Sequence, residues 1–248
     1  MQPFRIERFD TVVSTNELVK HGLERGYGEG LVCRAVEQVG GYGRQGRTWA
    51  SPRGGLYQSL LLRPDVPASR VPTLSLVVAL ATRGALLEAG GLEPDIVQVK
   101  WPNDVVCAQG KLVGISLETH AGGVCVGIGV NVFRPAGEMA VGGKNSPAYL
   151  AELAEGDAAS LAVEVVGDKV LDAFAGRYEL WQREGFTPFV EQFNSCNALA
   201  GKQVSIADRN GRVVAAGPVA GVDANGSLLV GGIPVSSGEA HILSHLLP

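Results

Sequence analysis

The chain has 248 residues, of which 46% are apolar and 19% are charged, which is the composition of a globular protein able to bury a core. Its 21 basic and 25 acidic residues give a net charge of −4, which offers no support for the basic face of a duplex-DNA-binding protein. Charged side chains in the first ten residues predict no signal peptide, and cysteines without CxxC spacing favour a reduced, cytoplasmic location.

The first predicted elements are a strand, a helix, a second strand and a loop. Apolar and charged residues alternate over Phe4–Phe9, as in an edge strand. Ser14 is a suitable N-cap for a helix that runs to about Arg25. The apolar run Leu31–Val36 predicts a buried strand, and the glycines of Val39–Gly55 predict a loop after it.

A strand at Leu56–Leu62 and a helix of roughly 20 residues from Ala68 follow. This helix contains the most apolar stretch of the chain, Leu74–Leu92. Arg83 and Glu88 interrupt that stretch, which therefore predicts a buried helix and not a membrane span.

Residues Asp95–Phe133 are rich in β-type residues around a turn at Trp101-Pro102-Asn103-Asp104. Strands are expected at Lys111–Thr119 and, with a clear period of two, at Val124–Val132. A polar connection at Arg134–Pro147 then leads into two predicted helices. They cover about Ala148–Ala154 and Leu161–Glu184.

The composition changes near Asn197 to short Gly- and Val-rich strands. Asn210-Gly211 and Asn225-Gly226 are strong hairpin dipeptides between them. The expected strands are Val204–Ala207, Val213–Ala216, Val219–Val222, Leu228–Val230 and His241–Leu243. We therefore predict two units, residues 1–197 and a small β-barrel at residues 198–248.

The loop contains Gly40-Gly41-Tyr42-Gly43-Arg44-Gln45-Gly46-Arg47-Thr48-Trp49. Glycine lets the backbone approach a ligand closely, and successive N–H groups can point at phosphate oxygens. Arg44 and Arg47 add guanidinium groups, which can donate two hydrogen bonds at once to a carboxylate or phosphate group. The Gly-Lys-Ser/Thr ending of a P-loop is absent. Taken alone, the motif is equally compatible with a surface loop that carries two solvated arginines.

A second motif joins Lys100-Trp101-Pro102-Asn103-Asp104 to Gly110-Lys111-Leu112-Val113-Gly114-Ile115. Because burying an unpaired ammonium is unfavourable, Lys111 at the start of a buried strand indicates a pocket for an anion. The alternative is that both lysines extend to solvent from strand ends. A third motif, Gly127–Val132, has two glycines on one face of a strand, which leaves room either for a flat group or for a close backbone contact.

In this order the motifs resemble the biotin–protein ligase family. That family has a GRGRxGRxW-type loop, a KWPND segment, a lysine in KLxGI and a GIGxN strand, and Ser-Thr-Asn in the first helix is also typical. The resemblance covers about Phe9 to His241, and KWPND followed by KLVGI is its most specific part. Tyr42 departs from the family, which usually has a basic residue there. Some members begin with a helix-turn-helix domain, and here a form without this DNA-binding domain is expected.

The resemblance implies an α/β (α+β) fold, with a mixed-sheet catalytic domain backed by helices at residues 1–197 and an SH3-like β-barrel at residues 198–248. It implies that biotin is activated with ATP to biotinyl-5'-AMP and then transferred to one lysine of a biotin carboxyl carrier protein or domain. Biotin, ATP and Mg²⁺ are the expected substrates and cofactor. No nucleic acid or membrane partner is expected, and a homodimer is left open.

The resemblance also implies residue roles. Lys111 is expected to bridge the biotin carboxylate and the α-phosphate. Arg44, Arg47 and Asp104 are expected to assist it, and Asp104 also to receive the incoming lysine. The expected biotin-binding residues are Ser14, Thr15, Asn16, Gln38, Gly41, Gly43, Arg44, Lys111 and Gly114. The expected nucleotide-binding residues are Arg47, Trp49, Asn103, Gly129 and Asn131, although Trp49 is as well explained as a packed core aromatic. No metal ligand is predicted, and Arg134–Ser146 is expected to fold over adenine.

Two alternatives remain at this point. A lipoate ligase or octanoyl transferase of the same fold group is disfavoured by the arginine-bearing loop and by KWPND. A biotin-sensing regulator that does not transfer biotin is disfavoured by the acidic pI and the expected lack of a DNA-binding domain.

Overall fold

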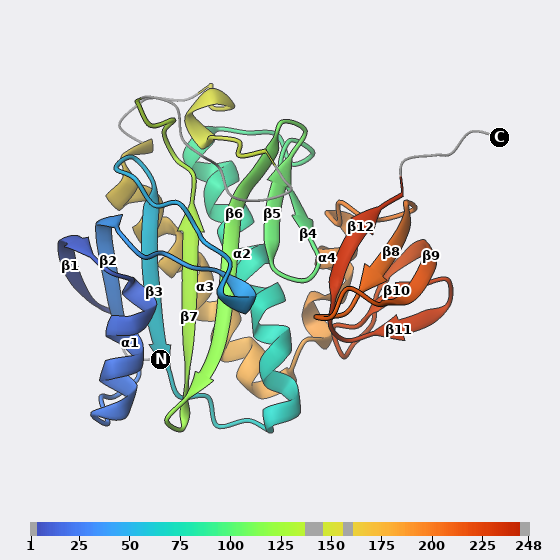
Figure 1. Ribbon diagram of the computed structural model, residues 1–248, viewed down its shortest axis with the longest axis horizontal. Coiled ribbons are helices and arrows are strands. Elements are labelled where there is room, and N and C mark those ends of the chain that lie inside the picture. Colours follow the sequence, from blue (N-terminus) through green and yellow to red (C-terminus); the bar gives the residue numbers. More distant parts are fainter. Residues whose placement is uncertain (1–3, 137–145, 156–160, 244–248) are drawn as a thin grey trace.

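The structure is a computed structural model that describes residues 4–136, 146–155 and 161–243. Figure 1 shows a seven-stranded sheet with helices on both of its faces, and a five-stranded sheet beside it. The strands of the large sheet are β1 (Arg5–Val12), β2 (Leu31–Gln38), β3 (Leu56–Leu62), β4 (Gln98–Lys100), β5 (Asp104–Cys107), β6 (Gly110–His120) and β7 (Gly123–Val130). The helices are α1 (Thr15–Glu24), α2 (Leu74–Gly90), α3 (Val163–Glu184) and α4 (Val190–Ser195). The small sheet contains β8 (Gln203–Ala207), β9 (Val213–Val222), β10 (Leu228–Val230), β11 (Ile233–Val235) and β12 (Glu239–Ile242).

The large sheet has the strand order β1-β2-β3-β7-β6-β5-β4. It is mixed because β1 pairs with β2 in parallel, whereas the other neighbouring strands are antiparallel. This confirms the predicted mixed sheet. The charged strand β1 lies at its edge, as the alternation of its residues predicted.

One face of the sheet, which we call the back face, is covered by α2 and α3 (Figure 1). Every second residue of β3 and β7 points into this core, including Leu60 and Val126, which are fully buried. On α3, the rings of Phe174, Tyr178 and Trp181 follow one another at centroid distances of 5.3 and 5.9 Å. The larger of the two hydrophobic clusters among the described residues therefore includes this side of the sheet.

The segment Ala68–Gly90, which is α2 with the turn before it, has the length and mean hydropathy (1.4) of a membrane span. Within its most apolar window, 67% is buried inside the protein. A core helix passes the same test, so this one segment is weak evidence for a membrane span. The predicted buried helix is confirmed, because α2 packs against both the sheet and α3 in the core.

The opposite, front face is covered by α1 only in part (Figure 1). Ser14 caps α1 by accepting a hydrogen bond from the Asn16 backbone N–H, as predicted. Val19 and Leu23 of α1 pack against β2, β3 and β7 in a small separate core. Beyond the N-terminus of α1, the middle of the front face of β6 and β7 carries small residues. They are Gly114, Ser116, Gly127 and Gly129.

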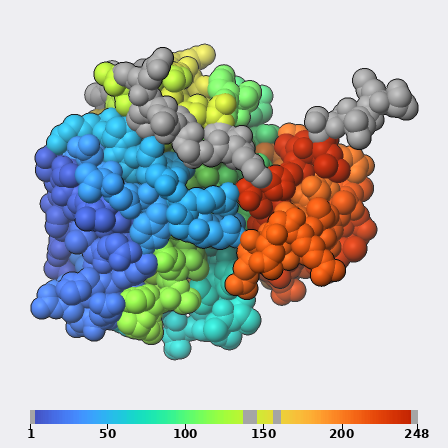
Figure 2. All heavy atoms as spheres, in the orientation of Figure 1, coloured from blue at the N-terminus to red at the C-terminus, as the bar shows by residue number. Residues whose placement is uncertain are grey.

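The C-terminal sheet is antiparallel with the order β11-β10-β9-β8-β12. Its strands curl around a small core that includes Val204 and Leu228, and both predicted Asn-Gly dipeptides lie in its turns. Trp101 Nε1 donates to the carbonyl oxygen of Gly226 at 3.0 Å, which joins this unit to the large sheet. Figure 2 shows the two units in contact. The predicted boundary at 197/198 falls between α4 and β8.

Several elements differ from the prediction. Ala148–Ala154 is not a helix and holds only a 3₁₀ turn at Leu150–Glu152. The two strands predicted over Val213–Val222 are one strand, β9, because the turn-like Gly217-Pro218 pair lies inside it. β11 and α4 were not predicted. Residues 137–145 of the predicted polar connection lie outside the described residues.

Arg34 of β2 is 2% exposed and joins the sheet to α3. Its Nη1 lies 2.7 Å from Glu164 Oε2 and 3.0 Å from Asp168 Oδ1, and its Nε donates to Gln58 Oε1 at 3.0 Å. Burial acts to raise the pKa of Glu164, but the hydrogen bonds and charges of Arg34 and, to a smaller extent, Arg8 together hold that pKa below its usual value. Arg34 thus stabilises the charged form of a carboxylate at the edge of the core.

We expect Arg34→Met to lower the free energy of unfolding by about 1–3 kcal/mol, because it deletes a buried guanidinium and leaves the buried side chain of Gln58 without its hydrogen-bond partner. The matched control is Arg8→Met, whose contact with Glu164 lies at the surface and should contribute less than about 1 kcal/mol. Urea denaturation measures both values. Equal losses for the two variants would contradict this assignment.

Candidate active site

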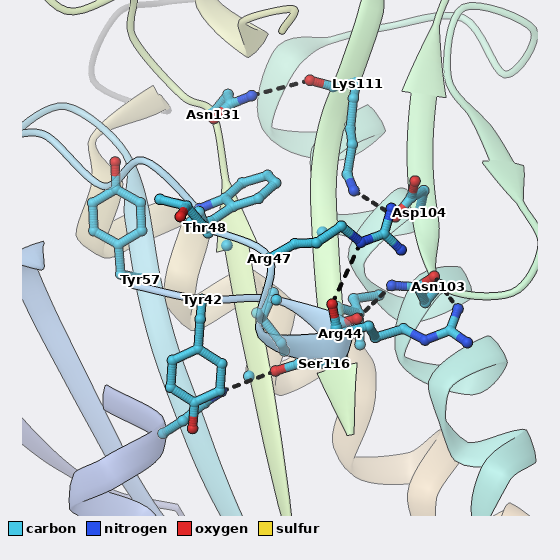
Figure 3. Close-up of a pocket in the computed structure, with 18 of the residues that line it drawn as sticks. Tyr42, Arg44, Arg47, Thr48, Tyr57, Asn103, Asp104, Lys111, Ser116 and Asn131 are labelled. Atoms are coloured by element: carbon cyan, nitrogen blue, oxygen red, sulfur yellow. Dashed lines mark hydrogen bonds and ion pairs between the residues drawn. The ribbon is translucent and has the colours of Figure 1, made fainter. Parts of the chain in front are cut away.

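A cavity of about 200 Å³ opens on the uncovered part of the front face (Figure 3). β6 and β7 form its floor, and the N-terminal end of α1 forms one wall. The loop of residues 40–49, called the glycine loop below, closes it from above. The turn at 101–104 and the strand β12 complete its walls, so both units of the fold contribute to one site.

The floor is built from two glycines on adjacent strands. Gly114 and Gly129 are direct cross-strand neighbours, and the indole of Trp49 lies against both. A Cβ atom at Gly129 would lie 2.5 Å from Trp49 Nε1, and one at Gly114 would lie 2.8 Å from Trp49 Cζ3. The flat group for which the glycines leave room is therefore Trp49 in this structure. Its Nε1 is buried and has no hydrogen-bond partner among the described residues.

Lys111 faces the cavity because β6 contains a bulge. Val105 of β5 pairs with Val113 of β6, and the next residue of β5, Val106, pairs with Lys111. Leu112 is therefore an extra residue in β6. Strict alternation from Gly114 would turn Lys111 toward the back face. The extra residue turns it to the front face instead, where it lines the cavity.

The ammonium of Lys111 is held by groups from two other segments. Its Nζ lies 2.7 Å from Asp104 Oδ1 and 5.3 Å from the centroid of the Trp49 ring. The Lys111 and Asp104 side chains are 22% and 15% exposed. Asn131 Nδ2 donates to the Lys111 backbone carbonyl at 3.0 Å, which fixes the main chain at this point. A cation is thus held at a defined place in a poorly hydrated cavity.

The two arginines of the glycine loop, both of which line the cavity (Figure 3), have different partners. Arg44 Nη1 donates to Asn103 Oδ1 at 3.0 Å. Burial lowers the pKa of the Arg44 guanidinium, and the negative charge of Asp104 opposes this effect. Arg47 is more exposed and pairs with Glu239 of β12 at 2.9 Å. One arginine is therefore held inside the cavity, and the other links the loop to the C-terminal unit.

The end of the cavity next to α1 is polar and neutral. The Thr15 backbone N–H and Oγ1 donate to Gln38 Oε1 at 2.8 and 3.1 Å. Asn16 Nδ2 donates to Ser116 Oγ at 3.0 Å. Ser14, Thr15 and Asn16 are all at least 96% buried, so these donors and acceptors are fixed before any ligand arrives.

All the predicted site residues except Gly41 line this cavity. Gly41 lies behind the lining, where a Cβ atom would be 2.5 Å from Ser51 Oγ, so glycine is required there for packing. The loop Arg134–Ser146, expected to cover adenine, lies mostly outside the described residues. The sequence interpretation missed part of the lining, because no local motif marks these positions. They include Tyr57, Ser116, Gly238, Glu239 and Ala240.

Gly129→Ala should displace the Trp49 indole, because the new methyl group would lie only 2.5 Å from Nε1. We expect a changed near-ultraviolet circular dichroism spectrum and a loss of about 1–2 kcal/mol in the free energy of unfolding, as for other overpacked sites. Gly43→Ala is the matched control, since its Cβ would meet nothing closer than 3.8 Å. If both variants keep the wild-type spectrum, the contact between Trp49 and the glycine floor is wrong.

Comparison with known proteins identifies the family to which the chain belongs. Residues 9–132 match the model of the biotin/lipoate A/B protein ligase family. The chain is 32% identical over 233 residues to the bifunctional ligase/repressor BirA of Bacillus subtilis, covering 90% of this chain and 68% of that protein. It is 34% identical over 207 residues to the biotin–[acetyl-CoA-carboxylase] ligase of Paracoccus denitrificans, covering 80% of this chain and 82% of that protein.

A solved structure agrees with these relatives. The biotin protein ligase from Aquifex aeolicus in complex with biotin and ATP matches 97% of this chain and 99% of its own, with a TM-score of 0.82 and 27% identity. The ordered motifs, the shared fold and the cavity they surround lead to one conclusion. The chain belongs to the biotin/lipoate A/B protein ligase family, and within it to the biotin–protein ligases, as the motifs predicted.

Proposed function

We propose that this ligase joins biotin to ATP as biotinyl-5'-AMP and then transfers biotin to a carrier lysine, with both steps in the cavity described above. The observation that carries the proposal is the convergence of Lys111, Arg44 and Arg47 on a cavity whose other end is neutral and polar. Such a cavity fits a ligand with a neutral polar head and an anionic end. Relatives named biotin–[acetyl-CoA-carboxylase] ligase and a neighbour that holds biotin and ATP support it.

In the first half-reaction, a carboxylate oxygen of biotin bonds to the α-phosphorus of ATP. The bond from that phosphorus to the oxygen of the β-phosphate breaks, and pyrophosphate leaves. The two reacting groups are both anions, and a fixed cation between them reduces their repulsion and stabilises the charge that develops on the phosphoryl oxygens. We assign this role to Lys111, and the neutralisation of the phosphates to Arg44 and Arg47.

We assign the neutral head of biotin to the α1 end of the cavity. There the side chains already hold one another in place, so little ordering is needed on binding. The residues of this end are Ser14, Thr15, Asn16 and Gln38, with Gly43 and Gly114 alongside. Gly41 acts through loop packing in this proposal, not through contact. The nucleotide is assigned to the part lined by Trp49, Asn103, Gly129 and Asn131.

Mg²⁺ accompanies ATP in this proposal. No cluster of three or more His, Cys, Asp or Glu side chains that could hold a metal ion is found in residues 4–136, 146–155 and 161–243. Mg²⁺ usually keeps several waters and binds substrate phosphates with one or two protein carboxylates. Asp104 is a carboxylate of the cavity that can meet this need. The residues therefore fit a metal ion that binds mainly to the triphosphate of ATP. When bound, Mg²⁺ would neutralise part of the phosphate charge.

In the second half-reaction, the ε-amino group of the acceptor lysine attacks the carbonyl carbon of the mixed anhydride. The carbon–oxygen bond to the phosphate breaks, AMP leaves, and the nitrogen gives up a proton. Asp104 borders the cavity and carries a negative charge, so we assign it the reception of this lysine. The acceptor is a biotin carboxyl carrier protein or domain, in keeping with the names of the relatives.

Duplex DNA is not expected to be a partner of this ligase. With a net charge of −4, the chain should not bind duplex DNA specifically at physiological salt, even with biotinyl-5'-AMP present. A sequence-specific gel shift that resists salt would contradict this expectation. A cytoplasmic location remains part of the proposal, and a homodimer stays open to sedimentation analysis.

The purified protein should release pyrophosphate with Mg²⁺-ATP and biotin, and should add one biotin to a carrier domain. Intact mass spectrometry of the carrier measures the addition. Lipoate in place of biotin is the control, because the family model also covers lipoate enzymes. A mass shift with lipoate and none with biotin would reject the proposed function.

Lys111→Met keeps the length of the side chain and deletes its charge. We expect biotinyl-5'-AMP formation to slow by ~10²–10³, as for loss of other pre-organised donors. Transfer from pre-made biotinyl-5'-AMP should suffer less, because its two anions are already joined. Single-turnover kinetics separate the two steps, and thermal unfolding should show little change.

Asp104→Asn is the matched variant, because it also removes the ion pair but keeps the ammonium of Lys111. It should therefore slow adenylation less than Lys111→Met. Adenylation by Lys111→Met within a few-fold of wild type would mean that Arg44 or Arg47 supplies the charge.

A further inference from the structure

We propose that Tyr42 is a positioning residue that fastens the glycine loop to α1 and so controls how long biotinyl-5'-AMP is retained. The inference rests on the proposed function for its ligand, but the contacts that carry it do not depend on that function. Tyr42 is the loop position at which this chain departs from the family motif. The structure shows what the tyrosine contacts.

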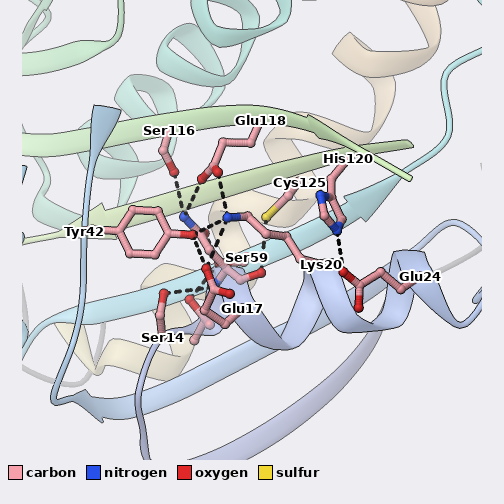
Figure 4. Close-up of polar contacts among 12 residues, drawn as sticks. Ser14, Glu17, Lys20, Glu24, Tyr42, Ser59, Ser116, Glu118, His120 and Cys125 are labelled. Atoms are coloured by element: carbon pink, nitrogen blue, oxygen red, sulfur yellow. Dashed lines mark hydrogen bonds and ion pairs between the residues drawn. The ribbon is translucent and has the colours of Figure 1, made fainter. Parts of the chain in front are cut away.

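The Tyr42 hydroxyl lies between two charged side chains of α1 (Figure 4). Lys20 Nζ donates to it at 2.7 Å, and the hydroxyl donates to Glu17 Oε1 at 2.5 Å. Lys20 Nζ also lies 5.1 Å from the centroid of the Tyr42 ring. The cluster extends to the sheet, because Lys20 pairs with Glu118 of β6 at 2.7 Å. Tyr42 is thus bound to a network that includes both α1 and β6.

A tyrosine suits this place because its hydroxyl both accepts and donates. It accepts from the Lys20 ammonium and donates to the Glu17 carboxylate at the same time. An arginine or lysine at this position has no acceptor and would put a second positive charge beside Lys20. Burial raises the pKa of Tyr42 to about 12, and its hydrogen bond lowers the pKa of Glu17. The contact therefore stays intact through the neutral range.

The Tyr42 contact acts on the whole loop, alongside the contacts of Arg44 and Arg47, because the two arms of the loop are paired. The Gly43 N–H donates to the Arg47 carbonyl at 2.7 Å, and the Trp49 N–H donates to the Gly41 carbonyl at 2.9 Å. Tyr42 itself bridges Thr48 on the opposite arm. Fastening Tyr42 therefore also positions Arg47 and Trp49, which line the cavity.

The tether should slow opening of the loop and leave the chemical step nearly unchanged. The Tyr42 hydroxyl is engaged with Glu17 and Lys20, so it stabilises the loop conformation without taking part in the reaction. Release of a ligand from beneath the loop requires the loop to move. Loss of the hydrogen bonds of the Tyr42 hydroxyl should therefore raise the rate at which biotinyl-5'-AMP dissociates.

The test uses Tyr42→Phe, which keeps the ring over Lys20 and deletes the hydroxyl. Hydrogen exchange of residues 40–49 without ligand should quicken about tenfold, and biotinyl-5'-AMP should dissociate faster by a similar factor. Single-turnover adenylation should stay within about twofold. Tyr27→Phe is the control, because Tyr27 is an exposed tyrosine just after α1. Wild-type exchange and dissociation rates in Tyr42→Phe would overturn the proposal.

A charge exchange supplies the second arm of the test. Tyr42→Arg should speed dissociation at least as much, because the new guanidinium repels Lys20. Adding Lys20→Gln should restore slow dissociation, since the introduced guanidinium would then face Glu17 without a competing cation. Failure of this rescue, or faster exchange without faster dissociation, would show that the contact does not control retention. If the wild type binds no biotinyl-5'-AMP, the proposed function fails, and the exchange rates still decide whether the tether exists.

Discussion

The organisation of this ligase depends on the incomplete covering of one face of its large sheet. α2 and α3 cover the back face, whereas α1 covers only part of the front face. An exposed apolar floor would bind a helix or another chain. Here the uncovered strands present glycine and serine, so backbone and not apolar side chain forms the floor. The space is closed instead by the glycine loop and by β12.

The charges around this floor are held in place by protein partners. Lys111 contacts Asp104, Arg44 contacts Asn103, and Arg47 contacts Glu239. Each cation is thus already oriented. A phosphate can bind to it either by displacing the protein partner or by contacting the cation beside that partner. The contact of Arg47 with Glu239 crosses from the glycine loop to the C-terminal unit, so closing the loop and docking that unit are coupled. The hydrogen bond from Trp101 to Gly226 holds the same two units together beneath the cavity.

Much of the site could be predicted from the sequence because its chemistry lies in short, ordered motifs. The period of two over Val124–Val132 predicted which residues face the core, and Ser14 predicted the start of α1. The bulge at Leu112 could not be predicted, since strict alternation sends Lys111 to the wrong face. The contribution of Glu239 was missed for a different reason. It lies 192 positions from its partner Arg47, and only the docking of two units brings them together. The contacts of Tyr42 depend in the same way on how the loop packs against α1.

The central claim is that one ligand spans the cavity from the α1 side chains to Lys111. A crystal structure with a non-hydrolysable analogue of biotinyl-5'-AMP tests it most directly. The account predicts that the ring system of biotin lies against Thr15 and Gln38, and that the phosphate mimic lies roughly 3 Å from Lys111 Nζ, at hydrogen-bond distance. An analogue bound elsewhere, or one whose phosphate mimic contacts neither Lys111 nor the arginines of the glycine loop, would contradict the account.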